Sequence, residues 1–453
     1  MIVRPHTLYF LGIGGIGMSA LARYYRRQGA RVAGYDRVRS ALTDQLTAEG
    51  IEVQFTEDPD AIPADLRTRK DVLVVRTPAV PPTSPLHLHW QAVGARIVKR
   101  SELLGAITRD HRTIAVAGTH GKTTVSTMLA HLLHEGGTPI NAFLGGISAN
   151  YGSNVLLDAQ ARMNVVEADE FDRSFLHLQP SEAIITSMDP DHLDIYGSPG
   201  SMFAAYAEFA ALCSGRLLVN ERIVDRIPGA ESYGFGPEAG SRAANVRVEE
   251  GAYRFDLHTD RGRLEEIRLG MPGRHNVENA VAAASMAMHL GVRPDQVRAS
   301  LASFRGVERR FQTIVEEPGT VLIDDYAHHP TELAAAIGSA RELYPGRRLL
   351  GIFQPHLYSR TRDLAAGFAQ SLALLDELIL LDIYPAREAP IPGIDAQWLL
   401  EQVPLGAKSF SSKDGLIDEL ERRDLDVVLM LGAGDIDRLM PHVARSLRKH
   451  VRP

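Results

Sequence analysis

Short apolar runs alternate with longer helix-type stretches along all 453 residues. This alternation predicts an α/β fold with parallel sheets, because parallel strands need a crossover that is usually a helix. The main exception is residues 245–269, where Asp260-Arg261-Gly262 separates two strand-like runs and predicts a small antiparallel excursion. The runs expected as parallel strands are residues 8–11, 72–75, 114–117, 165–166, 183–185, 321–323, 349–353, 378–381 and 427–431.

The chain is too long for a single hydrophobic core. Domains of ~150 residues are typical, so a chain of this length predicts about three of them. We place their boundaries to give residues 1–106, 107–308 and 309–453.

The charge and cysteine content exclude several classes of protein. With 56 acidic and 49 basic residues the net charge is −7, which provides no basic field for nucleic acid or an anionic membrane. The only cysteine, Cys213, excludes an intrachain disulfide framework and a cysteine-based zinc cluster. The longest apolar runs fall short of the ~18 residues of a membrane span, and the N-terminus lacks a signal-peptide pattern. We therefore expect a cytoplasmic protein.

The segment Gly118-Thr119-His120-Gly121-Lys122-Thr123-Thr124 has the features of a phosphate-binding loop. It follows an apolar run and precedes a helix-like stretch, so its backbone N–H groups and the helix N-terminus can hold phosphate oxygens. Lys122 is placed to reach the transferred phosphate and the Thr123 hydroxyl to reach Mg²⁺. The pattern departs from the full P-loop signature at Val116, where the first glycine would stand. The segment predicts ATP binding.

A second glycine-rich turn lies near the N-terminus. Residues 12–17 read Gly-Ile-Gly-Gly-Ile-Gly after a strand and before a helix, and Asp36 ends the next strand. This fingerprint is typical of nicotinamide dehydrogenases, but the same geometry suits the diphosphate of a UDP-sugar. The separate ATP loop favours the UDP-sugar, because a dehydrogenase has no need of ATP.

Polar residues follow the strands downstream of the ATP loop. Glu167, Asp169 and Glu170 follow one strand, and Asp189, Asp191 and His192 follow the next. Ligands of open α/β sheets bind at the carboxyl ends of the strands, and Mg²⁺ prefers oxygen ligands. These groups predict a magnesium nucleotide site. The polar residues 273–279 lead into an Ala-rich helix, where they can contact a base or cap the helix.

These segments together resemble the Mur ligases over nearly the whole chain. The resemblance implies a Rossmann-like UDP-binding N-terminal domain, a central ATPase domain with a P-loop, and a Rossmann-like C-terminal domain that brings the amino acid. The matching segments are residues 12–17, 118–124, 167–170, 174–178, 191–192, 273–276, 324–332, 353–356 and 389–393.

Within the family, the motifs are most similar to those of members that add L-alanine to UDP-N-acetylmuramate. The resemblance implies that the lactyl carboxylate attacks the γ-phosphate of ATP to give an acyl phosphate, from which the amine of L-alanine displaces phosphate. Positioning and charge neutralisation suit this chemistry, since phosphoryl transfer needs little else. Family members add a free amino acid or, in one sister enzyme, a salvaged peptide, so a salvaged peptide is the alternative acceptor. We expect the protein to be a monomer or a homodimer.

The resemblance also implies a role for individual residues. The catalytic residues would be Lys122, Glu167, His192, Arg310 and Asp325. Mg²⁺ would be held by Thr123 and Glu167, with His192 at a second metal position. ATP would contact Gly118 to Thr124, Asn276, Asn279, Arg310 and Asp325. The UDP-sugar would contact Gly12, Gly14, Gly15, Ile16, Gly17, Asp36, Thr77 and His177, and the acceptor His328, His356 and Arg360.

Two departures from the family pattern affect this assignment. Several Mur ligases hold metal through a carbamylated lysine, but this chain has no lysine between Lys122 and Lys408. Leu357 stands where an arginine often follows the Phe-Gln-Pro-His motif, which leaves Arg360 or Arg362 to bind the acceptor carboxylate. A non-catalytic nucleotide switch is a third hypothesis, and the polar cluster of the C-terminal domain argues against it.

Overall fold

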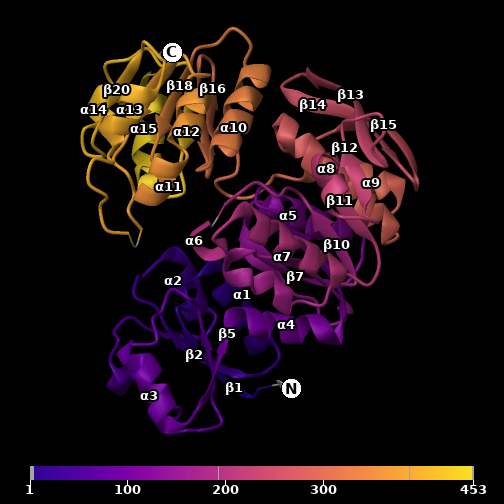
Figure 1. Ribbon diagram of the computed structural model, residues 1–453, viewed down its shortest axis with the longest axis vertical. Helices are drawn as coiled ribbons and strands as arrows, with labels where there is room; N and C mark the ends of the chain where they lie inside the picture. Colours follow the sequence, from indigo (N-terminus) through magenta and orange to yellow (C-terminus); the bar gives the residue numbers. More distant parts are fainter. Residues whose placement is uncertain (1–4, 192, 387, 451–453) are drawn as a thin grey trace. The chain divides into compact units, whose positions relative to one another are not determined.

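Three sheets, one after another along the chain, form the framework of the protein (Figure 1). The structure is a computed structural model that describes residues 5–191, 193–386 and 388–450. The inner strands of all three sheets are largely buried, as expected where helices cover both faces, whereas outer strands such as residues 262–268 are mostly exposed. The α/β fold class expected from the sequence is confirmed, with three domains.

The N-terminal sheet has five parallel strands in the order β3-β2-β1-β4-β5. The order reverses between β1 and β4, which places a ligand crevice beside the turn after β1. Its strands are β1 (Thr7–Leu11), β2 (Arg31–Tyr35), β3 (Glu52–Gln54), β4 (Leu73–Arg76) and β5 (Arg96–Lys99). Its helices are α1 (Ile16–Arg27), α2 (Ala41–Ala48), η1 (Pro59–Ala61), α3 (Pro85–Val93) and α4 (Arg100–Asp110).

The central sheet has ten strands in the order β15-β14-β13-β12-β11-β10-β6-β9-β7-β8. Its strands are β6 (Arg112–Ala117), β7 (Ile140–Ser148), β8 (Ser153–Leu156), β9 (Met163–Glu167), β10 (Glu182–Ile185), β11 (Leu217–Asn220), β12 (Glu231–Gly234), β13 (Ser241–Glu249), β14 (Ala252–Thr259) and β15 (Gly262–Arg268). Its helices are α5 (Lys122–Glu135), η2 (Phe171–His177), α6 (Leu193–Tyr196), α7 (Pro199–Ala211), η3 (Glu221–Arg226), α8 (Arg274–His289) and α9 (Pro294–Ser303). Parallel strands β10 and β9 flank β6, so the loop after β6 lies between two other strand ends.

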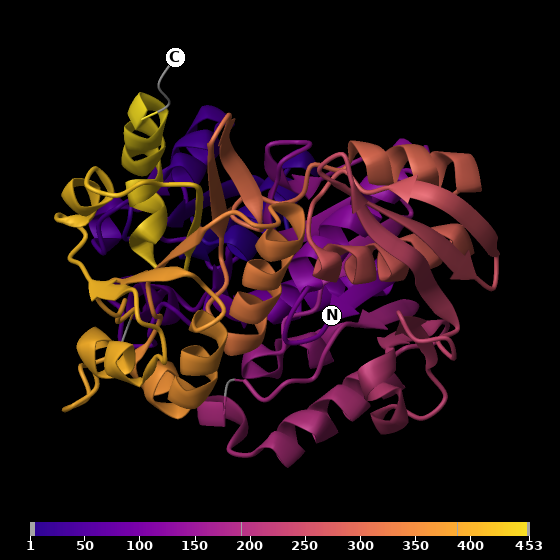
Figure 2. The same cartoon turned by 90° about the horizontal axis from the view of Figure 1, so that it is seen from above.

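The C-terminal sheet has six strands in the order β16-β17-β21-β18-β19-β20. Its strands are β16 (Gln312–Glu317), β17 (Thr320–Asp325), β18 (Leu349–Phe353), β19 (Glu377–Leu380), β20 (Lys408–Phe410) and β21 (Val427–Leu431). Its helices are α10 (Pro330–Leu343), α11 (Tyr358–Asp363), α12 (Ala365–Leu372), α13 (Ala396–Gln402), α14 (Leu416–Leu420), η4 (Asp435–Leu439) and α15 (Met440–His450). Helices α10 and α12 pack against each other, which both ribbon views show (Figures 1 and 2).

Every run expected as a strand lies in or overlaps a strand of the structure. Two antiparallel pairs were not expected: β7 with β8, and the edge strand β16 with β17. The dipeptide Pro318-Gly319, a common turn sequence, joins β16 to β17 and was the overlooked signal. Helix α4 runs through residue 106, where the first domain boundary was expected.

The chain divides into two compact units. The first contains the described residues up to Arg242 together with Leu257–Leu264 and Asn279–Leu301, and the second contains Ala243–Asp256, Glu265–Glu278 and the residues from Ala302 onward. The N-terminal sheet and strands β6 to β12 of the central sheet therefore share the first unit. Asn154, which is fully buried, joins them by donating to the carbonyl oxygen of Ile16 and to the Ser19 hydroxyl on α1.

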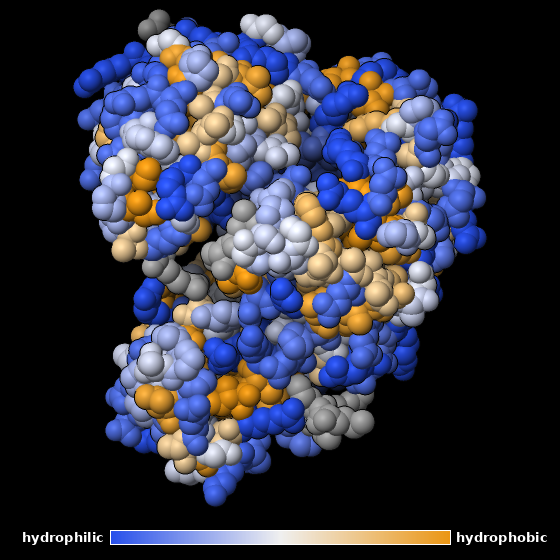
Figure 3. All heavy atoms as spheres, in the orientation of Figure 1, coloured by the Kyte–Doolittle hydropathy of each residue, from blue (hydrophilic) through white to orange (hydrophobic). Residues whose placement is uncertain are grey.

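Large exposed apolar side chains are few and come from scattered positions, such as Val38, Leu88 and Leu374. On the face shown in Figure 3, hydrophilic residues predominate and hydrophobic ones form separate groups. Within the described ranges, no helix is both long and apolar enough to cross a membrane.

Candidate functional site

The loop between β6 and α5 has the backbone that its sequence predicts. Gly118 has φ +129° and Gly121, the N-cap of α5, has φ +81°, and both values lie in the region that favours glycine. A Cβ at Gly118 would stand 2.0 Å from Oγ1 of Thr186 and 2.8 Å from the backbone N of Ser187. The loop therefore lies flat against the segment after β10, with the N-terminus of α5 at its end.

The segment after β10 fixes this loop through side-chain hydrogen bonds. The Ser187 hydroxyl accepts from the His120 backbone N–H at 2.8 Å and lies 2.9 Å from the Thr119 hydroxyl. The Asp189 backbone N–H donates to the Thr119 hydroxyl, and the Asp189 carboxylate lies 3.1 Å from Nε2 of His120. A loop held in this way is preorganised for phosphate, since little has to be ordered on binding.

Lys122 is paired with a carboxylate that the sequence analysis did not assign to it. Its Nζ donates to Oε1 of Glu170 at 2.8 Å and to the carbonyl oxygens of Gly118 and Thr119. Burial lowers the pKa of Lys122, but the carboxylates Glu170, Glu167 and Asp169 outweigh burial and raise it above its ordinary value. Burial raises the pKa of Glu170, and the positive charge of Lys122 opposes this rise. The ammonium group therefore stays charged beside the phosphate loop.

The carboxylate of Glu167 fits the role of a magnesium ligand. Its Oε2 is buried and has no hydrogen-bond partner among the described residues, although carboxylate oxygens ordinarily find one. A Cβ at Gly145 on β7 would stand 2.1 Å from this atom, so glycine there makes room for the carboxylate. The buried Thr123 is the second residue of α5, directly after Lys122. One carboxylate and one hydroxyl suit a cation that takes its remaining ligands from phosphates and water.

The second metal position falls on His192, which lies outside the described residues. The structure shows no cluster of three or more His, Cys, Asp or Glu side chains suited to a metal within residues 5–191, 193–386 and 388–450.

The two asparagines expected at the nucleotide belong to different units. Asn279, in the first unit, has its Oδ1 3.0 Å from the place of a Cβ at Gly121, beside the ATP loop. Asn276, in the second unit, is fully buried and donates to the Pro272 carbonyl oxygen. Asn279 is thus placed at the loop, and Asn276 stabilises the start of α8.

Two residues that were expected to contact the UDP-sugar, Asp36 and Thr77, pack against the N-terminal glycine turn. The Gly14 backbone N–H donates to Oδ2 of Asp36 at 2.8 Å, and a Cβ at Gly12 would stand 2.5 Å from Cγ2 of Thr77. Gly15 is the N-cap of α1, and Ile16 and Gly17 are its first two residues. Asp36 therefore shapes the turn. His177 is exposed, and its carbonyl oxygen packs against Gly105 of α4.

In the second unit, Asp325 ends β17 at the start of a polar cluster. Its carboxylate accepts from the backbone N–H groups of Phe311 and Ala327, each at 2.7 Å. Burial raises the pKa of Asp325 to about 7, with Arg310 opposing the rise. The guanidinium carbon of Arg310 lies 4.9 Å from the centroid of the Tyr326 ring, and Nη1 of Arg310 lies 3.9 Å from Oε1 of Glu332. Asp325 and Arg310, predicted to act together, are therefore neighbours.

The three residues expected at the acceptor also lie close together. The rings of His328 and His356 are 6.1 Å apart, and Nη1 of Arg360 is 3.4 Å from Nδ1 of His356. Burial lowers the pKa of His328, with Glu332 opposing this and Arg360 adding to it. Leu357 has φ +70°, which is uncommon for a branched residue and concentrates strain at this turn. The cluster presents a cation and two imidazoles at the carboxyl ends of β17 and β18.

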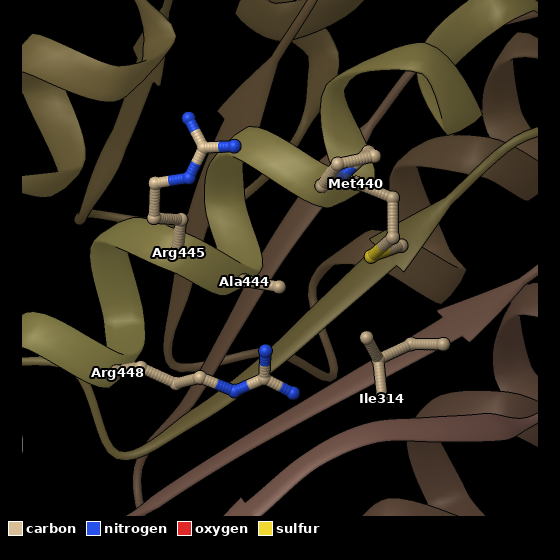
Figure 4. A pocket seen from close by; sticks show the side chains of 6 residues that line it. Ile314, Met440, Ala444, Arg445 and Arg448 are labelled. Atoms are coloured by element: carbon tan, nitrogen blue, oxygen red, sulfur yellow. The ribbon is translucent and has the colours of Figure 1, made fainter.

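A separate open pocket of the second unit contains none of the predicted site residues. Figure 4 shows Arg445 and Arg448 of α15 and Ile314 of β16 at its wall. The other lining residues are Met440, Pro441 and Ala444.

A parallel sheet with an ATP loop, a second glycine turn and a separate C-terminal polar cluster defines a class of three-domain ligases, and the chain belongs to the Mur ligase family. The family model of the catalytic domain matches residues 7–112, that of the Mur ligase middle domain residues 116–287, and that of the glutamate ligase domain residues 309–434.

Individual proteins similar to this chain give a more specific comparison than the family models. The chain is 49% identical over 450 residues to the UDP-N-acetylmuramate–L-alanine ligase of Porphyromonas gingivalis strain W83, covering 97% of this chain and 99% of that one. The solved UDP-N-acetylmuramate–alanine ligase of Thermotoga maritima is 27% identical, with a TM-score of 0.80 and 98% of both chains covered. The murein peptide ligase of Psychrobacter arcticus shares the fold, with 22% identity, a TM-score of 0.69 and coverage of 99% and 100%.

Proposed function

We propose that the chain is an ATP-dependent ligase that joins L-alanine to the lactyl carboxylate of UDP-N-acetylmuramate, the first amino-acid addition in peptidoglycan precursor synthesis. The observation that carries this proposal is the similarity to a UDP-N-acetylmuramate–L-alanine ligase over nearly the full length of both chains. The two phosphate-binding turns within one compact unit agree with it, because the reaction needs a UDP-sugar and ATP together. We place the reaction in the cytoplasm, where ATP is supplied.

In the first step the lactyl carboxylate attacks the γ-phosphorus of ATP, and the bond to the leaving ADP oxygen breaks. Lys122 is charged and fixed at the loop, so it can stabilise the negative charge on the transferring phosphoryl group. On nucleotide binding its Nζ would exchange the Glu170 carboxylate for phosphate oxygens. Glu170 therefore holds the ammonium group in place before ATP arrives.

Thr123 and Glu167 would hold Mg²⁺, which neutralises charge on the β- and γ-phosphates when bound. The unpartnered Oε2 of Glu167 and the space opposite Gly145 support this assignment. His192 remains our proposal for the second metal position.

In the second step the amine of L-alanine attacks the acyl carbon, inorganic phosphate leaves, and the amine loses a proton. We assign the alanine carboxylate to Arg360, because a guanidinium forms two parallel hydrogen bonds with a carboxylate. His328 is neutral at neutral pH, and its Nδ1 donates to the Tyr326 carbonyl oxygen at 3.0 Å. Its Nε2 therefore has the lone pair that can accept a hydrogen bond from the incoming amine.

ADP release tests the proposal directly. The rate should depend on UDP-N-acetylmuramate and rise with L-alanine above other amino acids and above a tripeptide. A higher kcat/KM with the tripeptide would favour a peptide-salvaging ligase. Calorimetry with NADPH and UDP-N-acetylmuramate tests the remaining alternative, since binding of NADPH without binding of the UDP-sugar would indicate a dehydrogenase.

A further inference from the structure

Arg100 lies between the two phosphate-binding turns of the first compact unit. It is the first residue of α4, and its Nη2 donates to Oδ2 of Asp169 at 2.9 Å. Asp169 precedes Glu170, the carboxylate that holds Lys122. An arginine of the N-terminal domain is thus anchored by a carboxylate beside the ATP loop.

The glycine turn makes room for this guanidinium. A Cβ at Gly17 would stand 2.7 Å from Nη1 and 3.3 Å from Cδ of Arg100. Gly17 is the second residue of α1, and the first N–H groups of a helix have no acceptor within it. The guanidinium therefore packs against the same helical turn that offers its N–H groups to a diphosphate.

Most of the hydrogen-bonding capacity of Arg100 is left for a ligand. A guanidinium has five N–H donors. Among the described residues, Asp169 is the only side chain that accepts a hydrogen bond from Arg100, and it does so from a single N–H. The side chain is 22% exposed, so it is reachable from solvent while fixed at one end.

We propose that Arg100 binds an oxyanion of the UDP-sugar, either its diphosphate or its lactyl carboxylate, and that Asp169 positions it. This inference rests on the proposed function, because it takes the glycine turn as the UDP-sugar site. A fixed guanidinium suits both groups, since its planar fork matches carboxylate and phosphate oxygens.

The competing explanation is that Arg100 only neutralises Asp169. In that case Arg100→Ala would act by exposing a carboxylate near the ligands, and Asp169→Asn would reverse the effect. The double variant Arg100→Ala/Asp169→Asn separates the two roles. If Arg100 contacts the UDP-sugar, the double variant stays defective, because the lost contacts are not replaced.

Calorimetry with UDP-N-acetylmuramate on the full chain tests the proposal. Arg100→Ala should raise the Kd about 10- to 100-fold, the range for a lost charge-assisted hydrogen bond. Arg100→Lys should recover only part of this, because lysine lacks the fork. Arg109→Ala is the matched control, since Arg109 is an exposed arginine at the other end of α4, and it should leave the Kd unchanged.

A parallel titration with UDP-N-acetylglucosamine, which lacks the lactyl carboxylate, identifies the oxyanion. An equal loss of affinity for both UDP-sugars in Arg100→Ala assigns the diphosphate. A loss confined to UDP-N-acetylmuramate assigns the carboxylate.

Two results would overturn the inference: an unchanged Kd in a folded Arg100→Ala, or full recovery in the double variant. Either leaves the proposed function intact provided that the wild-type enzyme binds UDP-N-acetylmuramate and releases ADP with L-alanine. Failure of the wild-type enzyme to bind this UDP-sugar would instead refute the proposed function itself.

Discussion

Replacing Lys122 by methionine should damage both catalysis and stability, for two separable reasons. In the proposed mechanism the charge of Lys122 stabilises the transferring phosphoryl group, so turnover should fall about 10³-fold or more, a barrier increase of ~4 kcal/mol. The stability effect arises from Glu170, whose side chain is 2% exposed and would lose its cation. Breaking a buried ion pair by removing one partner typically costs about 3–5 kcal/mol.

The stability loss should depend on pH with a defined sign. Burial already raises the pKa of Glu170, and removal of Lys122 takes away the charge that opposes this rise. At pH values between the ordinary pKa of glutamate, about 4.3, and the raised pKa of Glu170 in the folded variant, Glu170 is ionised in the unfolded chain but protonated in the folded one. Each pH unit in that window should therefore lower the free energy of unfolding of Lys122→Met by about 1.4 kcal/mol, and the deficit should shrink in acid.

Urea unfolding at several pH values and ADP release measure the two effects independently. Adding Glu170→Gln to Lys122→Met should restore most of the stability, because the buried charge is gone, but none of the turnover. Turnover of Lys122→Met within tenfold of the wild type would refute the catalytic role. A double variant as unstable as the single one would refute the explanation by an unpaired Glu170.

Three further predictions concern single residues. Glu167→Gln should raise the Mg²⁺ concentration needed for half-maximal ADP release more than it changes the Kd for the UDP-sugar, and an unchanged Mg²⁺ titration would move the ligand to another carboxylate. Because burial raises the pKa of Asp325 to about 7, this residue should contribute a fall of about 1.4 kcal/mol per pH unit to the unfolding free energy between about pH 4 and 7, and Asp325→Asn should remove that contribution in urea unfolding. Arg360→Lys should raise the KM for L-alanine roughly 10- to 100-fold with the KM for ATP near normal, and steady-state kinetics showing an unmoved alanine KM would place the acceptor elsewhere.

Features set by local sequence were predictable. The loop at Gly118 was recognised because a strand, a glycine turn and a helix start follow one another, and the structure has that order. The carboxylates of residues 167–170 were recognised because parallel strands end at the same edge of a sheet.

Pairings between distant segments were not predictable in the same way. Glu170 lies 48 residues from Lys122, and Asp169 lies 69 residues from Arg100, so nothing in either local sequence identifies the partner. The hydrogen bond from Gly14 to Asp36 is a similar case, since the sequence indicated a ligand contact for Asp36 and the structure shows that its carboxylate stabilises the turn. Single-sequence patterns locate strand ends, but they do not determine which side chains meet there.

The isolation of Lys122 in the sequence makes it a target for covalent labelling. From Arg100 to Ala407 it is the only lysine, and its ammonium group is buried against Glu170. General amine reagents should therefore modify Lys70, Lys99 and the lysines from residue 408 onward before they reach it. An adenosine reagent with an amine-reactive group in place of the terminal phosphates would instead be delivered to this one amine. Peptide mapping would then report occupancy of the ATP loop from a single modified residue, even in variants that no longer turn over.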